Sequence, residues 1–284
     1  MKCKICQQDV PTGKLKCTSC GAINLPNQVI SSVSGSPIED GSVLLSDVKS
    51  AEMDRIDVGF MNMIFGGPVL DPEDENCLEY GPGLVTDSVY LIGGMPGAGK
   101  STLALQLLDH IASCIPEKEC LYIGTEESLP QIRSRADRLK IKNQNRIRMV
   151  SGMTGGIDIG SVLMHRKPSV TVIDSLQGLV GEDDNASVEI CKSAKQYAMT
   201  LKSPIIITQH VTKGLEIAGV QTIQHEVDGV MLFLPNENNE DIRELEVNPK
   251  NRFGRAYIKM YFEMGANGLE PLPLDFDPDD LLEE

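Results

Sequence analysis

Residues 94–101 read GMPGAGKS and match the phosphate-binding pattern G-x-x-x-x-G-K-[ST] at every fixed position. Glycines let such a loop turn its N–H groups toward phosphate oxygens, and the helix that follows adds partial positive charge. Lys100 would reach the β- and γ-phosphates of a nucleoside triphosphate, while the Ser101 hydroxyl would bind Mg²⁺. The other candidate nucleotide contacts in this loop are Gly94, Gly97, Ala98 and Gly99.

The residues on both sides of the loop have the patterns that this motif requires. Residues 89–92 form an apolar run that is typical of a buried strand. Leu103, Leu107 and Ile111 follow at four-residue intervals and would line one face of a helix. The order of strand, glycine loop and helix favours a nucleotide site over a turn that matches by chance.

Three further strands are predicted to end in polar residues. Apolar runs over 120–125, 170–174 and 205–209 predict these strands, and helical patterns over 128–140 and 187–202 alternate with them. Parallel strands place ligands at their carboxyl ends. The residues at the ends of these strands are therefore expected to surround one nucleotide.

Each of these polar residues has a candidate role. Asp174 ends an apolar run and would hold Mg²⁺ through water. Glu126 would polarise the attacking water as general base, although it could instead cap the helix that follows. The choice of base between Glu126 and Glu127 is left open. Gln209 and His210 would contact the γ-phosphate and report whether it is present.

The alternation of elements predicts an α/β fold with a mostly parallel sheet that is covered on both faces. From residue 229 onward the pattern changes to antiparallel strands joined by hairpins. Residues 53–65 are weakly helical, and residues 151–160 form a glycine-rich loop. One side of the helix at 128–140 is basic and is interpreted as a solvent-facing surface. Its residues are Arg133, Arg135, Arg138 and Lys140.

Four of the eight cysteines lie at the start of the chain, as Cys3-x₂-Cys6-x₁₀-Cys17-x₂-Cys20. Two such pairs predict a Cys₄ site for Zn²⁺ in a small module, with a redox pair or an iron–sulfur site as the alternatives. Cys114 and Cys120 flank or enter predicted core elements, where a free cysteine is expected to behave as a small hydrophobic residue.

Composition suggests four parts of the 284-residue chain: a zinc module (1–27), a linker (28–50), an ATPase domain (51–270) and an acidic tail (271–284). The net charge of −15 argues against a surface coated in nucleic acid, although not against one local contact. The tail would keep the chain soluble or dock on a basic partner. The polar N-terminus and the lack of long apolar runs predict a soluble cytoplasmic protein without a membrane segment.

A further basic cluster, Lys250-Asn-Arg252-Phe-Gly254, falls in a turn between two of the late strands. Its two cations are one residue apart and would point the same way on a strand. They would be either a charged hairpin surface or a finger that reaches the γ-phosphate held by a neighbouring subunit.

Several segments together resemble the bacterial RadA (Sms) branch of the RecA/DnaB superfamily over about residues 1–270. They are the Cys₄ module followed by GAIN, then GGMPGAGKSTL, YIGTEES, RADRL, VIDSLQ, HVTK, H-x-VD and KNRFG. They occur in this order at spacings like those of the family. KNRFG together with the zinc module is specific to this branch.

The resemblance implies a RecA-like ATPase core that uses ATP and Mg²⁺, an N-terminal Cys₄ zinc ribbon, and hexameric rings. It also implies binding to single-stranded or branched DNA and motor-driven branch migration during recombinational repair. A recombinase or replication protein is the expected partner of the acidic tail. By the same resemblance, Thr102 would join the nucleotide site and His210 would be a sensor. Lys250 and Arg252 would act across the subunit interface, and Lys213 would begin a DNA-contacting loop of the central channel.

The chain departs from the family pattern in three places. It is expected to be a short form without the family's C-terminal Lon-protease-like domain, and the loop after VIDSLQ is acidic. Val220 and Gln221 stand where the family usually has Pro and Arg. Two other functions therefore stay open: a KaiC-like ATPase that regulates protein partners, and a ring helicase of the DnaB type. The zinc module and HVTK argue against the helicase.

Overall fold

The computed structural model describes residues 44–47, 54–65, 83–151, 158–181, 183–211, 223–273 and 275–278. The chain divides into two compact units, Met1–Glu52 and Met53–Glu284. In the first unit only the short 3₁₀ helix η1, Leu45–Asp47, is described. The expected zinc ligands Cys3, Cys6, Cys17 and Cys20 and the expected DNA contact Lys213 lie outside the described residues. The proposed domain boundaries remain predictions.

The second unit is built on a nine-stranded sheet in the order β11-β10-β9-β8-β3-β7-β6-β4-β5. Neighbouring strands from β8 to β5 in this order run parallel, whereas β9, β10 and β11 pair antiparallel. The expected mostly parallel α/β sheet is therefore confirmed. The strands are β3 (Val89–Gly94), β4 (Cys120–Gly124), β5 (Ile147–Ser151), β6 (Thr171–Asp174), β7 (Ile205–His210), β8 (Gly229–Pro235), β9 (Ile242–Asn251), β10 (Lys259–Gly265) and β11 (Gly268–Pro271).

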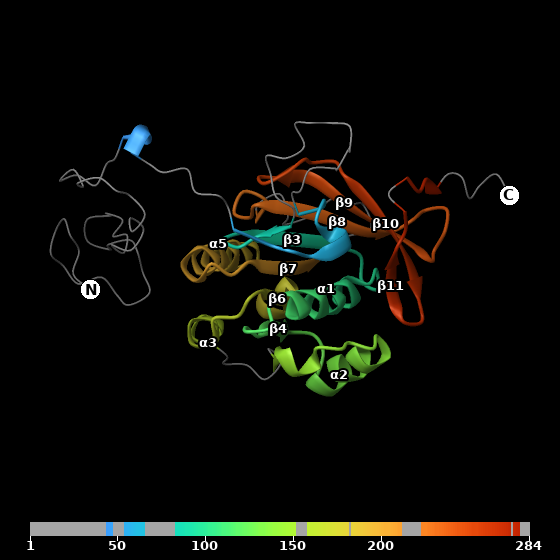
Figure 1. Cartoon of the computed structure of the whole chain (residues 1–284), viewed down its shortest axis with the longest axis horizontal. Coiled ribbons are helices and arrows are strands. Elements are labelled where there is room, and N and C mark those ends of the chain that lie inside the picture. The colour runs from blue at the N-terminus through green and yellow to red at the C-terminus, as the bar shows by residue number, and fades with distance from the viewer. Residues whose placement is uncertain are drawn as a thin grey trace. The chain divides into compact units, whose positions relative to one another are not determined.

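Helices cover both faces of this sheet, and Figure 1 shows α1 and α2 on one side of the strands with α3 and α5 on the other. The side chains of β3 alternate accordingly. Tyr90 and Ile92 pack in the core beneath α1, while Val89 and Leu91 pack with α3 and α5. The helices are α1 (Lys100–Cys114), α2 (Leu129–Arg138), α3 (Ile159–Arg166), α4 (Leu176–Val180) and α5 (Asp184–Leu201), with 3₁₀ helices η2 (Gly59–Met61) and η3 (Gln144–Arg146).

Strand β8 differs from the expectation that all late strands pair antiparallel. Tyr90 of β3 lies opposite Gly229 in a parallel ladder, and β9 then pairs with β8 antiparallel. The 18 residues between His210 and Gly229 are long enough for the crossover that a parallel pair needs. Strand β8 is thus the last strand of the parallel half and the first of an antiparallel extension, β9 to β11.

The segment 53–65, expected to be weakly helical, forms mainly other structure. Its strand β1 (Arg55–Ile56) pairs with β2 (Leu84–Val85), and only the short helix η2 follows. Met61, Ile64 and Phe65 are fully buried. Their helix-like spacing therefore reflects burial of one side of a turn against the core rather than a regular α-helix.

Two helices were missing from the sequence prediction. Helix α3 begins inside the expected glycine-rich loop, where the Asp158 side chain accepts a hydrogen bond from the Ser161 N–H at 3.2 Å. Helix α4 has only five residues, too few for a periodic pattern. None of the described helices combines the length and apolar character that crossing a membrane requires.

The two cysteines expected in or beside core elements differ in their burial. Cys120 in β4 is buried as expected, but Cys114 is exposed, so its expected role as a small core hydrophobe is wrong. Cys114 is the last residue of α1 and lies one helical turn beyond the partly exposed His110, on the same face of the helix.

Candidate nucleotide-binding site

The loop between β3 and α1 has the backbone that its glycines predict. Gly97 and Gly99 have φ angles of +81° and +105°, which side chains on L residues rarely tolerate. A Cβ atom on Gly94 would lie 2.3 Å from the carbonyl oxygen of Phe233. The turn and its close contact with β8 therefore both require glycine. The first residues of α1 line a hollow in the surface, and the N-terminus of a helix suits an anion.

Lys100 is held inside this loop. Only 5% of the residue is exposed, and its Nζ atom donates hydrogen bonds to the carbonyls of Gly94 at 2.7 Å and Met95 at 3.0 Å. Burial lowers the pKa of Lys100 to about 8, although the nearby charges of Asp174 and Glu126 oppose the shift. The ammonium group is therefore placed for a phosphate and poorly stabilised by water.

Asp174, at the end of β6, is fixed by side chains from both neighbouring strands. Thr208 of β7 donates a hydrogen bond to Oδ1 at 2.6 Å, and the Tyr122 hydroxyl of β4 donates one to Oδ2. Burial and the adjacent Asp174 raise the pKa of Tyr122 well above its ordinary value, so Tyr122 stays a donor. The Asp174 carboxylate therefore has a defined position in the pocket.

Glu126 lies where β4, β6 and β7 end together. The Ser175 hydroxyl donates a hydrogen bond to its Oε1, and its Oε2 lies 3.6 Å from Nε2 of His210. Ser175 is itself tied to Thr125, whose hydroxyl accepts from the Ser175 N–H at 2.8 Å and donates to its carbonyl at 2.9 Å. The Glu126 side chain is 41% exposed, so it is held on one side and open to the pocket on the other.

Glu127 is differently placed. Arg135 donates two hydrogen bonds to its two carboxylate oxygens, at 2.5 and 2.6 Å, and this fork occupies both oxygens. Helix α2 is capped by Ser128 with Gln131, so neither glutamate serves as its cap. Of the two acids, the geometry favours Glu126 as the one available to a reacting water.

The two residues at the end of β7 point in opposite directions. His210 lines the pocket, and its backbone exchanges hydrogen bonds with the Gln177 side chain at 3.1 and 3.2 Å. Gln209 is 6% exposed and is absent from the pocket lining, because alternate residues of a strand face opposite sides of the sheet. Within the described residues its Oε1 finds no hydrogen-bond partner. The structure therefore does not bring Gln209 to the candidate nucleotide.

Together these groups surround a cavity of about 510 Å³, large enough for a nucleotide. Gly94 and Ala98 support the loop without lining the cavity. The lining residues are Pro96, Gly97, Gly99, Lys100, Ser101, Thr102, Tyr122, Gly124, Glu126, Glu127, Ile132, Arg135, Arg138, Asp174, His210, Arg243 and Met264.

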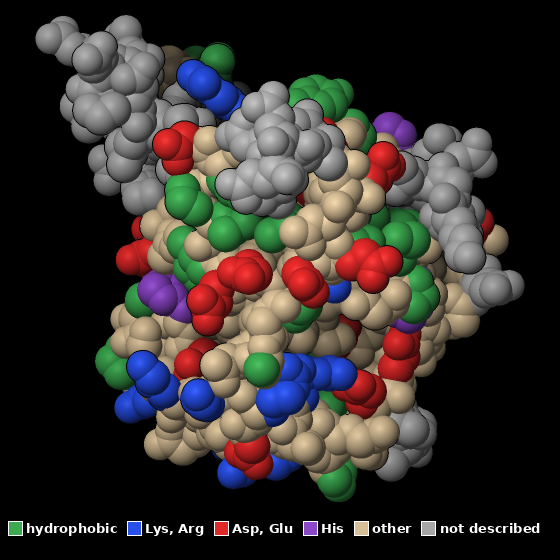
Figure 2. Space-filling view, turned by 90° about the vertical axis from the view of Figure 1, so that its right-hand side faces the viewer, with side chains coloured by type: hydrophobic (Ala, Val, Ile, Leu, Met, Phe, Trp, Pro, Cys, Tyr) green, Lys and Arg blue, Asp and Glu red, His purple; other side chains and the backbone are tan. Residues whose placement is uncertain are grey.

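Sequence reasoning missed the arginines of this lining. Arg243 of β9 donates a hydrogen bond from Nε to the Ala98 carbonyl at 3.0 Å, which ties the antiparallel extension to the phosphate loop. Arg135 and Arg138 had been interpreted as a solvent-facing surface of α2. Both signs of charge meet on the face in Figure 2, where Asp and Glu side chains lie in a band above a group of Lys and Arg side chains.

Lys250 and Arg252 lie at the opposite end of the sheet from the phosphate loop. Asn251 pairs with Gly229, and Gly229 pairs with Tyr90 near the start of β3. Lys250 and Arg252 therefore do not line the nucleotide cavity of their own chain.

Both cations hydrogen-bond to the segment 224–228, but Lys250 makes more of these bonds than Arg252. Lys250 donates from Nζ to the carbonyls of Gln224 at 2.7 Å and Val227 at 2.6 Å, and burial lowers its pKa. Arg252 bonds Asp228 at 3.2 Å, yet its side chain remains 52% exposed.

Comparison with known proteins gives the family of this chain. Residues 70–216, more than half of the chain, match the AAA domain family. The DNA repair protein RadA of Treponema pallidum is 41% identical over an alignment of 196 residues that covers 66% of this chain and 41% of that protein. That of Bacillus subtilis is 33% identical over 291 residues, covering 94% of this chain and 58% of that protein.

The chain is a RadA-type member of the AAA domain family. It spans 41% and 58% of the lengths of the two RadA proteins compared. A KaiC-like protein of Pyrococcus horikoshii has a similar structure, with a TM-score of 0.59 and 19% identity, over 78% of this chain and all of that one. This likeness confirms the RecA-like P-loop fold.

The different surroundings of the two glutamates predict different effects of removing their charges. Glu126→Gln should lower the rate of ATP hydrolysis by about 10²- to 10⁴-fold, because the candidate general base is removed while the residues of the phosphate loop are unchanged. Glu127→Gln should change that rate by less than about tenfold. Phosphate release at saturating ATP, with nucleotide affinity measured in parallel, checks the order. A larger loss in Glu127→Gln would assign the base to Glu127.

The lowered pKa of Lys100 predicts that ATP binding weakens as the pH rises. With a pKa of about 8, the free protein loses the positive charge of Lys100 between pH 7 and pH 9. The apparent Kd for ATP should then increase by about tenfold at pH 9. Fluorescent ATP-analogue titrations across this range measure it. Lys100→Arg is the matched control, since its guanidinium stays charged and its pH dependence should be flat; equal slopes would refute the assignment.

Proposed function

We propose that this chain is an ATP-hydrolysing DNA motor of the RadA type, acting in recombinational DNA repair. The observation that carries the proposal is the convergence of Lys100, Asp174 and Glu126 on one cavity beside a phosphate loop. RadA relatives that are named DNA repair proteins support the biological setting. The zinc module, with Cys3, Cys6, Cys17 and Cys20 as its ligands, remains part of the proposal.

The loop and helix α1 would hold the triphosphate. Backbone N–H groups between Gly97 and Thr102 would surround the phosphate oxygens, and Lys100 would exchange its loop carbonyls for the β- and γ-phosphates. The pocket also has the oxygen donors that suit Mg²⁺, namely the Ser101 hydroxyl and the Asp174 carboxylate. When bound there, Mg²⁺ would neutralise charge on the phosphate oxygens.

Glu126 would then act on the water that attacks the γ-phosphorus. The water oxygen forms the new P–O bond and gives its proton to Glu126, while the bond to the bridging oxygen breaks and releases ADP and phosphate. Ser175 holds the Glu126 carboxylate from behind, and His210 lies 3.6 Å away on the pocket side. These contacts would orient the base before the water arrives.

The contact between His210 and Glu126 offers a route by which DNA could control ATP hydrolysis. Lys213, the proposed DNA contact, follows His210 by three residues. Single-stranded DNA held at Lys213 would shift the end of β7, and with it the distance between His210 and Glu126. The acidic overall charge and the mixed charge on the face in Figure 2 favour a local DNA contact over a broad one.

DNA control of the site predicts that single-stranded DNA raises the steady-state rate of ATP hydrolysis. The increase should fall as salt rises, because phosphate contacts release counterions. Lys100→Ala is the blank for contaminating activity, and Lys213→Ala should lose stimulation while keeping the basal rate. A rate that ignores DNA at low salt would overturn the motor and leave a regulatory ATPase directed at protein partners.

Arg252 would complete the site of a neighbouring subunit in a ring. It lies at the sheet edge opposite its own phosphate loop and is half exposed, so it could reach only a nucleotide bound by another copy. Asp228 would hold its guanidinium in position until then. Lys250 is more fully occupied by carbonyls of its own chain and would support the turn.

A trans role for Arg252 predicts that two inactive variants restore each other. Arg252→Ala keeps the base, and Glu126→Gln keeps the arginine, so an equal mixture should regain up to about a quarter of the wild-type rate through mixed interfaces. ATP hydrolysis of the mixture, compared with each variant alone, measures this. Arg255→Ala, in the exposed end of the same turn, is the control and should stay active. A mixture no more active than its parts would contradict the trans role.

A further inference from the structure

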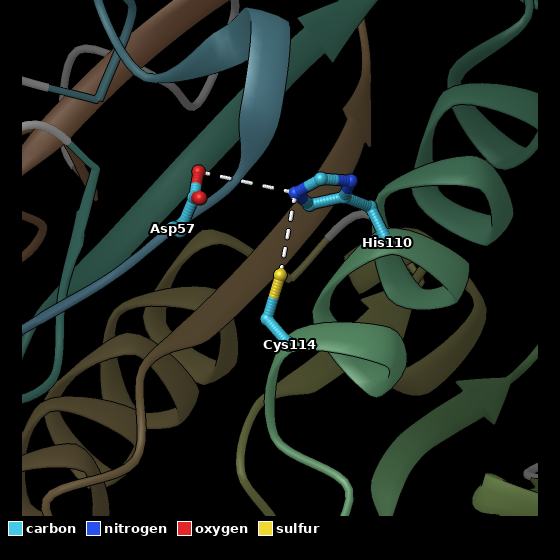
Figure 3. Close-up of side chains that lie close together, drawn as sticks. All are labelled: Asp57, His110 and Cys114. Atoms are coloured by element: carbon cyan, nitrogen blue, oxygen red, sulfur yellow. Dashed lines mark hydrogen bonds and ion pairs between the residues drawn. The ribbon is translucent and has the colours of Figure 1, made fainter.

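A second cluster of chemically active side chains lies on the surface of the ATPase unit, away from the nucleotide pocket. It consists of Asp57, His110 and Cys114, whose nearest ligand atoms all lie within 4.8 Å of one another. Figure 3 shows Asp57 and Cys114 facing the same nitrogen of the His110 ring from two sides. Asp57 follows strand β1, while His110 and Cys114 come from the last turns of α1.

The two distances from His110 Nε2 to its partners are close to those between ligands of one zinc ion. Cys114 Sγ lies 3.5 Å from His110 Nε2, and Asp57 Oδ1 lies 3.9 Å from that nitrogen. Zinc–sulfur and zinc–nitrogen bonds of about 2.3 and 2.0 Å in a tetrahedron place the sulfur and nitrogen about 3.6 Å apart. A carboxylate oxygen in the same tetrahedron lies about 3.4 Å from the nitrogen, so Asp57 needs to move by about half an ångström.

Two of the three donors, Asp57 and His110, are held in place by neighbours. Oδ1 of Asp57 accepts hydrogen bonds at 2.8 Å from both the Gly59 N–H and the Asn62 side chain. The His110 ring packs on Gly59 so closely that a Cβ atom there would lie 2.9 Å from its Cε1. Residues 110 and 114 are one turn apart on α1 and so share a face. Little conformational freedom would be lost when an ion binds.

We propose that Asp57, His110 and Cys114 form a Zn²⁺ site, separate from the expected Cys₄ module. A thiolate, an imidazole and a carboxylate together are a donor set that zinc accepts, and three protein ligands leave the fourth position for water. The exposure of Cys114 also fits, whereas Cys120 and Cys191 are buried and belong to no such cluster within the described residues. Bound zinc would fasten the segment 54–65 to the helix that begins with Lys100.

Site-resolved cysteine labelling tests this proposal on the full chain. The protein is treated with a maleimide after incubation with and without Zn²⁺, and labelling of each cysteine is read by peptide mass spectrometry. Zinc should slow labelling of Cys114 by about tenfold or more, because a coordinated thiolate no longer reacts freely. Reading Cys114 itself separates this site from any zinc held by the N-terminal cysteines.

Two variants and one control decide the outcome. His110→Gln and Asp57→Asn should each remove most of the protection, and His165→Gln, an exposed histidine on α3, should keep it. Cys114→Ser should hold one zinc fewer per chain by chelator competition, with an unchanged melting temperature in the absence of metal. The proposal is wrong if zinc leaves Cys114 labelling unchanged, or if protection persists in His110→Gln. Because ATP hydrolysis is not the readout, either result is independent of the proposed function.

Discussion

The candidate active site depends on the way in which one carboxylate is shared by three strands. Asp174 ends β6, and its two oxygens accept hydrogen bonds from Tyr122 of β4 and Thr208 of β7, the strands on either side. A carboxylate at the end of a buried strand is costly unless such partners compensate it. Because one donor comes from each neighbour, a shift of either strand would leave one oxygen of Asp174 without its partner. The strand register and the position of the acid therefore reinforce each other.

Another carboxylate, this one fully buried, performs the corresponding task at the opposite end of the parallel strands. Asp228 is fully buried, and it accepts hydrogen bonds from the Val89 N–H, Lys195 and Arg252. Loss of one partner from such a group leaves buried charge without compensation and strongly destabilises the fold, so the positions of all three partners are constrained. Asp174 thus fixes the edge that faces the nucleotide, whereas Asp228 fixes the turn that carries the arginine. Each end of the parallel sheet is organised around an acid.

The fold and the centre of the site could be predicted because their signals are local. The motif around Lys100 and the apolar runs that end at Asp174 and Glu126 each lie within a few residues of sequence. The direction of Gln209 could also have been foreseen, since period-two alternation places it opposite His210. Arg243 could not, because its contact with the Ala98 carbonyl depends on the register between β9 and β8. The different roles of the adjacent Glu126 and Glu127 could not be predicted either, because the pairing of Glu127 with Arg135 depends on the position of α2 in space.

Lys100 shows how stability is exchanged for binding at this site. Its folded-state pKa of about 8 lies below the ordinary lysine value of 10.5. The unfolded chain therefore binds the proton more tightly, and the cost to folding is fully present below pH 8 and is relieved as the pH rises toward 10.5. The carbonyls of Gly94 and Met95 offset part of that cost. A phosphate group carries a full negative charge where these carbonyls offer only partial dipoles. A bound nucleotide would therefore offset the free energy that burial of the Lys100 charge costs the folded protein. The burial that makes the Lys100 charge costly to the folded protein therefore also favours the binding of an anion beside it.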